Sequence, residues 1–179
     1  MKNTFMFSAL MAITLLSTSV FSNWDPDVEQ EYDGKAKQTI KEMKAADPSL
    51  QTFFDDAAGY AVIPSVGKGG LGIGGAHGKG ILYEGGEVKG MVSMTQLTIG
   101  FQAGGQVYSE IIFFKDETAL KDFERGNYEM GAEASAVAVT EGASAQANYN
   151  SGVAIFTQVK GGLMAAATVG GQKFKVDLK

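Results

Sequence analysis

Three basic side chains lie in a glycine-rich stretch without carboxylates, and they are the residues best suited to chemistry. Lys68, His77 and Lys79 fall within residues 57–83, where neither Asp nor Glu occurs. Because the whole chain has a formal net charge of −5, this stretch is a local reversal of sign. Exposed backbone N–H groups of glycines, together with flanking cations, create a positive field that suits an anion. We therefore predict an anion site formed by Lys68, His77, Lys79, Gly69 and Gly70.

A second interpretation of this stretch stays open, because glycines also serve simply as turn residues that adopt positive φ, beside solvated cations. If the stretch is a site, a phosphate headgroup suits it better than a planar cofactor, since a backbone can wrap phosphate without an aromatic shelf. Gly70, Gly72 and Gly75 match the dinucleotide pattern G-x-G-x-x-G. That pattern needs a helix directly after it, whereas a strand is expected here, so no nucleotide cofactor is predicted.

The residue inventory argues against an enzyme. The chain has no cysteine and one histidine, which excludes disulfides, thiolate chemistry and a multi-histidine metal site. Ser109 and Glu110 are neighbours on an expected strand and would point to opposite faces, so they do not form a catalytic pair. We expect Glu110 to be a buried, hydrogen-bonded carboxylate. No catalytic residue, metal or cofactor is predicted.

Composition and the first residues limit the classes of protein to which the chain can belong. With 179 residues, 45% hydrophobic and 20% charged, the chain is typical of one globular domain. Its acidic balance argues against nucleic acid as a partner. Lys2, the apolar residues 5–16 and the small residues before Asn23 indicate a signal peptide over residues 1–22. We therefore expect residues 23–179 to form one domain that is periplasmic or secreted.

Helices are expected at the start of that domain, over residues 25–58. Asp25 and Pro26 form a typical helix start, and an apolar stripe with helical spacing follows. A second helix is expected over residues 50–58, which would complete a helical hairpin. On the first helix Lys37, Lys41 and Lys44 cluster beside the apolar stripe and are expected to add membrane-surface contacts. The alternative is a helix packed on the domain whose charges only complement its dipole.

Strands and tight turns are expected over residues 59–179, with one further helix from Asp116 to Gly126. Gly85-Gly86 is typical of a two-residue hairpin turn. Apolar parity changes after Met94, so we expect a bulge or a sharp bend near Thr95-Gln96 that turns Leu97 and its partners toward the core. Alternating small residues predict a strand over residues 132–138, followed by strands over residues 153–159, 163–169 and 173–178. The predicted fold is α+β, with a bent, antiparallel, partly barrel-like sheet.

Four long blocks of sequence resemble successive blocks of the SYLF lipid-binding domain family. They read GYAVIPSVGKGGLGIGGAHGKG, TIGFQAGGQVYSEIIFF, GNYEMGAEASAVAVTEGASA and GVAIFTQVKGGLMAAATVGGQKF. The likeness runs from about residue 53 to residue 174. It implies a non-enzymatic domain that binds phosphoinositides or other anionic phospholipids at a membrane surface. In the fungal and animal branch the family is also tied to actin-associated membrane remodelling.

Two alternatives to lipid binding stay open. The small-residue stretch of residues 132–147 and the weakly charged strands would suit a structural envelope protein that self-assembles into a homo-oligomer or binds a protein partner. Actin binding, as in the eukaryotic relatives, is the other. We expect headgroup binding near Lys68, His77 and Lys79 as the main function.

Overall fold

The computed structural model describes residues 25–162 and 169–179. Helix α1 spans Pro26–Ala46 and begins as the sequence predicted. The carboxylate of Asp25 accepts a hydrogen bond from the backbone N–H of Asp27 at 3.0 Å, and Pro26 occupies the first helical position. Both features satisfy or remove N–H groups that a helix start leaves without partners. The predicted signal peptide, residues 1–22, lies outside the described residues.

The rest of the helical hairpin and the third helix are short. A 3₁₀ turn, η1, spans Pro48–Leu50 and leads into α2, Gln51–Asp56, so the second helix ends two residues before its predicted end. Helix α3 spans Glu117–Glu124, and its cap Asp116 accepts from the N–H of Ala119 at 3.0 Å. Gly126 follows with φ of 74°, a conformation that glycine adopts without strain.

In the described residues six strands form one sheet, and they confirm the predicted α+β class. The strands are β1 (Gly59–Glu84), β2 (Glu87–Phe114), β3 (Tyr128–Glu129), β4 (Val137–Ala138), β5 (Val153–Gly162) and β6 (Gln172–Leu178). Their order is β3-β6-β2-β5-β4, with β1 paired to β2, and a second 3₁₀ turn, η2 (Ser144–Gln146), precedes β5. All the pairs are antiparallel except β4 with β5, which is parallel.

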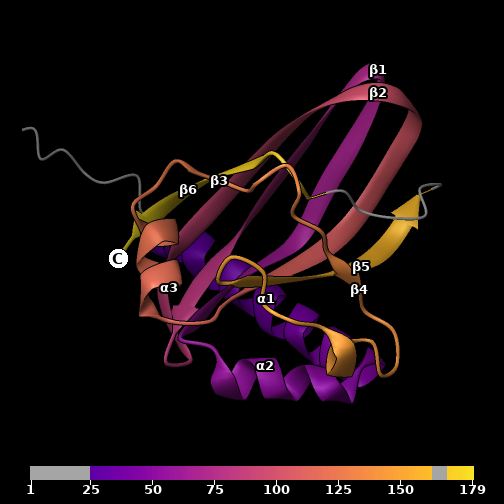
Figure 1. The fold of residues 1–179 in the computed structure, drawn as a ribbon. Coiled ribbons are helices and arrows are strands. Elements are labelled where there is room, and N and C mark those ends of the chain that lie inside the picture. Colours follow the sequence, from indigo (N-terminus) through magenta and orange to yellow (C-terminus); the bar gives the residue numbers. More distant parts are fainter. Residues whose placement is uncertain (1–24, 163–168) are drawn as a thin grey trace, which may run out of the picture.

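β1 and β2 form a long ribbon that bends in its middle (Figure 1). Gly85 and Gly86 make the connecting turn with φ of 61° and 83°, as predicted. β2 pairs with β6 through residues 90–96 and with β5 through residues 106–114, and between these segments β1 is its only partner among the described residues. There the ribbon rises away from α1 and α2 to a rounded apex (Figure 1). Gly70 is required at this bend, because a Cβ there would lie 2.3 Å from the Cα of Gly74.

The two faces of the bent ribbon bury different cores. The concave face encloses one cluster of apolar side chains, among them Tyr108, Phe114 and Phe174, and α3 covers it with Leu120 and Phe123. The outer face packs near its base against α1 and α2 through a second cluster (Ala36, Met43, Phe53, Val62, Ile81, Tyr83, Phe113 and Phe156 among others). The hydroxyl of Tyr83 donates to the carboxylate of Asp33 at 2.8 Å and ties α1 to this face.

Two expectations about strands were wrong. The pairing of β2 is regular through Thr95-Gln96, with no bulge there, and Leu97 is 72% exposed rather than turned to the core. Register shifts occur instead elsewhere in the pairing of β1 with β2, including one between Leu71 and Ile73 at the bend. The strand predicted over residues 132–138 is reduced to β4 at its end. Most of the strand predicted over residues 163–169 lies outside the described residues.

Candidate anion-binding face

The outer face of the ribbon changes character between the helices and the apex. In β1 the outward side chains are, in order, those of Tyr83, Ile81, Lys79, His77 and Ile73, with Gly75 between the last two. Tyr83 and Ile81 are buried under α1, whereas Lys79 and His77 lie beyond it and are exposed. Alternate residues of a strand share a face, so these side chains form one column. Along this column the side chains are first apolar and covered by α1, then basic and exposed, and finally apolar and exposed.

Strand pairing places further cations beside this column. Lys79 lies opposite Ser93 of β2, and Ser93 lies opposite Lys175 of β6. One step nearer the apex, His77 lies opposite Thr95, and Thr95 lies opposite Lys173. Directly opposite residues of antiparallel strands share a face. The result is two parallel cross-strand rows, in each of which a hydroxyl stands between two basic residues. We call His77, Lys79, Lys173 and Lys175 the basic belt.

Most of the basic belt is available to a ligand. Within residues 25–162 and 169–179 the belt has one ion pair, between Lys173 Nζ and Glu129 Oε2 at 3.5 Å. A groove of about 480 Å³ lies at the Lys173 and Lys175 half of the belt and is lined by Ser93, Thr95, Asn127, Glu129, Lys173, Phe174 and Lys175. Neighbouring strands are about 4.8 Å apart, so the outer residues of a row are about 10 Å apart at their Cα atoms. Long lysine side chains can close that span around one phosphate group.

Beyond the basic belt, toward the bend of the ribbon, the outer face becomes apolar. Ile73 of β1 is 67% exposed and Leu97 of β2 is 72% exposed, and Leu97 lies opposite Gly75. Residues 69–75 and 97–105, which form the bend, contain no charged residue. We call Ile73 and Leu97 the apolar apex. Burial of such side chains away from water is favourable, so their exposure marks a surface available to a partner.

The structure brings together only part of the predicted anion site. His77 and Lys79 lie side by side on the outer face, but Lys68 lies on the concave face, opposite Gln106. Lys68 is 4% exposed, and burial lowers the pKa of its ammonium group. Gly69 and Gly70 are strand residues that pair with Gly105 and Gly104. The predicted cluster is therefore divided between two faces, and the lipid contacts assigned to it stay a prediction.

The three helix cations differ in their surroundings. Lys37 Nζ forms an ion pair with Asp33 Oδ2 at 2.6 Å, and Lys44 Nζ lies 4.1 Å from the centre of the Phe54 ring. Lys41 is exposed and has no ion pair within the part of the chain that the structure describes. Two of the three are thus occupied by contacts within the fold. A contribution of this helix to membrane contact stays a prediction.

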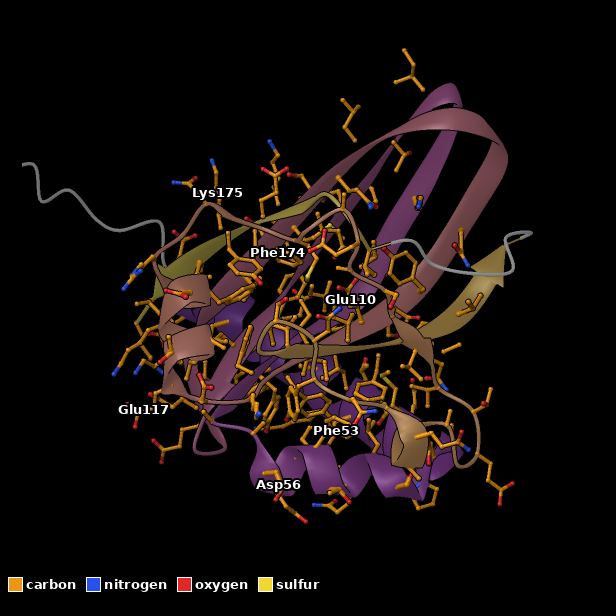
Figure 2. All side chains as sticks on the ribbon, viewed as in Figure 1. Phe53, Asp56, Glu110, Glu117, Phe174 and Lys175 are labelled. Carbon is orange, nitrogen blue, oxygen red and sulfur yellow. The ribbon has the colours of Figure 1, made fainter. Side chains whose placement is uncertain are left out.

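Glu110 is buried and hydrogen-bonded, as predicted. It lies in the middle of the molecule, whereas Lys175 lies at its periphery (Figure 2). Glu110 Oε2 accepts from Nε2 of Gln172 at 2.9 Å, and its other oxygen has no hydrogen-bond partner among the described residues. Burial raises the pKa of Glu110 to about 7, although the Gln172 hydrogen bond opposes that shift. Its neighbour Ser109 donates to the carbonyl of Pro64 at 3.0 Å, so both polar groups serve the fold.

Sequence reasoning missed half of the basic belt and all of the apolar apex. A strand was predicted over residues 173–178, but its two exposed lysines, Lys173 and Lys175, were not assigned to a site. Which strand lies beside it, and in which register, is long-range information that a single strand does not carry. Ile73 and Leu97 were missed because a large apolar residue in a strand is by default assigned to the core.

Two features are absent from residues 25–162 and 169–179. No group of three or more His, Cys, Asp or Glu side chains is placed to hold a metal ion there. Among the helices of that part of the chain, none is long and apolar enough to cross a membrane.

Comparison with known proteins gives the family of this domain. Residues 95–179 match the model of the Ysc84 family, described as "Las17-binding protein actin regulator". The chain also resembles Beta cell expansion factor A of Aeromonas veronii, with 33% identity over 132 residues, which cover 73% of this chain and 50% of that protein. The chain thus carries a domain of the Ysc84 (SYLF) family, and it spans about half the length of this curated relative.

Proposed function

We propose that this protein is a non-enzymatic, exported domain that binds anionic phospholipid headgroups, phosphoinositides among them, and associates reversibly with a membrane surface. The observation that carries the proposal is the basic belt, in which Lys79 and Lys175 lie on either side of Ser93. Ammonium groups supply charge to a phosphate, and the intervening hydroxyl supplies a hydrogen bond. A net charge of −5 on the chain makes this basic face the part that an anionic surface attracts.

The expected strength of the interaction follows from the number of cations. Each lysine near an anionic membrane contributes about 1 kcal/mol, and the contribution decreases as salt screens the charges. Replacement of two belt lysines should therefore weaken binding by about 2 kcal/mol, or roughly 30-fold. Lys41 at the exposed surface of α1 would add a smaller term of the same kind.

Flotation with lipid vesicles tests the proposal. The protein should float with vesicles of phosphatidylcholine and phosphatidylglycerol, and much less with vesicles of phosphatidylcholine alone. The variant K79Q/K175Q should lose most of this difference. A matched control, K121Q/R125Q, removes two positive charges from α3, which packs on the concave face, and should bind like the parent protein. Equal recovery of the parent protein from both kinds of vesicle would refute the proposal.

A further inference from the structure

We infer that the apolar apex inserts into the acyl region of the bilayer while the basic belt holds the headgroups, so that the bend of the β1–β2 ribbon is the membrane anchor. This inference rests on the proposed function and assigns a second role on the same face. The apex is formed by Ile73 and Leu97, which are 67% and 72% exposed.

The order of residues along the face argues for a bilayer as the occupant. From Lys79 to Ile73 the column advances six residues, which is about 20 Å along a strand. A membrane shows the same order along its normal, with anionic headgroups outside and apolar chains within. The belt matches the headgroup layer in charge, and the apex matches the acyl layer in polarity. A protein partner would not require basic residues to be followed by apolar residues along one direction.

The composition of the bend supports insertion. Residues 69–75 and 97–105 contain no charge, so no ionised side chain has to enter the apolar layer. The backbone of the bend is paired along one edge of each strand, since Gly69, Gly70 and Ile73 of β1 pair with Gly105, Gly104 and Ile99 of β2, while the other edge of β1 has no partner strand among the described residues. Paired backbone groups reduce the cost of moving a strand out of water. Shallow insertion of the apex alone is therefore compatible with the structure.

Two salt conditions separate the apex from the belt. At low salt both should contribute, and at high salt the contribution of the belt should be screened. The variant I73S/L97S should thus lose the vesicle binding that persists at high salt, by about tenfold or more. K79Q/K175Q should instead lose the salt-sensitive part and keep the persistent part. L178S is the matched control, because Leu178 is an exposed apolar residue at the far end of β6 from the apex.

A depth measurement tests insertion directly. The chain has no cysteine, so a single L97C substitution can carry an environment-sensitive nitrobenzoxadiazole dye at one known place. On anionic vesicles the dye should shift to the blue and be quenched by doxyl groups attached to the acyl chains. The same dye at T118C, exposed on α3, should show neither change.

Each outcome decides between the two roles. If the protein binds anionic vesicles but the dye at residue 97 stays in water, insertion is wrong and headgroup binding stands. If the protein does not bind anionic vesicles, both proposals fail. If the dye shifts without vesicles as protein concentration rises, the apex joins two copies of the chain, and insertion is again refuted. Unchanged melting of I73S/L97S would show that a loss of binding does not come from unfolding.

Discussion

The carboxylate of Asp47 accepts a hydrogen bond of 2.7 Å from the backbone N–H of Ser144, a residue 97 positions further along the chain. The same buried carboxylate accepts from the N–H of Gly142 at 3.2 Å and from the N–H of Ser49 at 3.1 Å. Asp47 therefore caps η1 and holds the loop around η2 against the helical hairpin. Burial alone would raise the pKa of Asp47, but the hydrogen bonds together hold it well below its ordinary value.

The first prediction concerns Asp47. Asp47→Ala should lower the free energy of unfolding by about 2–4 kcal/mol, because it leaves buried N–H groups without an acceptor. Urea denaturation followed by circular dichroism measures this change. Asp55→Ala, on the exposed side of α2, is the control and should change stability little. Because the folded pKa of Asp47 is depressed, its stabilisation is present above the unfolded value of 3.8 and is lost as the pH falls below that value.

The second prediction concerns Glu110 and has the opposite sign. Its folded pKa of about 7 exceeds the ordinary value of 4.5, so between these values the folded state binds more protons than the unfolded state. Stability should therefore fall as the pH rises from 4.5 to 7, by an amount on the order of 3 kcal/mol, and change no further from this group above that range. Glu110→Gln should remove most of this slope in denaturation curves recorded at several pH values. A slope unchanged in the variant would contradict the assignment.

The third prediction uses a pair of glycines. A Cβ on Gly80 would lie 2.0 Å from the carbonyl oxygen of Val62, so the backbone has to move. Gly80→Ala should lower the melting temperature strongly, equivalent to about 2 kcal/mol or more. Gly34 lies in α1 with no atom within 4 Å of such a Cβ. Gly34→Ala should instead stabilise the protein by about 0.5–1 kcal/mol, because alanine favours the helix.

The fourth prediction separates the two faces of β1. Lys68 lies on the concave face and is almost fully buried, whereas Lys79 lies on the exposed outer face. Lys79→Gln should weaken binding to anionic vesicles several-fold, and Lys68→Gln should leave the salt-dependent part of that binding unchanged. Titration of each variant with vesicles at two salt concentrations provides the comparison. A larger loss for Lys68→Gln would return the site to the concave face.

Local signals in the sequence predicted the elements of this fold well. Asp25 and Asp116 each cap a helix because a short carboxylate before a helix accepts from its free N–H groups. Gly85-Gly86 fixed the turn between the two long strands because both residues need positive φ. In each case the cause lies within four residues of the effect, so one segment of sequence contains it.

The basic belt was predicted only in part, because the strand pairing that brings its residues together is not local in the sequence. His77 and Lys79 were found through the sign of the charge around them, but their partners Lys173 and Lys175 lie about a hundred residues later and meet them only through β2. Leu97 was assigned to the core by parity, which assumes that apolar residues face inward. That assumption fails where the ribbon leaves the body of the protein at its bend.

The two-residue turn at Gly85-Gly86 has a consequence for the opposite end of the ribbon. The facing pairs of β1 and β2 begin at this turn with Glu84 opposite Glu87, and after one register shift between Tyr83 and Leu82 they run without interruption from Leu82 to Ile73. One extra residue there would move Lys79 away from Ser93 and reverse which side chains meet the solvent along one of the two strands. The length of a solvent-exposed connection thus sets the alignment of charges in three strands, and deletions or insertions at this connection should be tolerated far less than its exposure suggests.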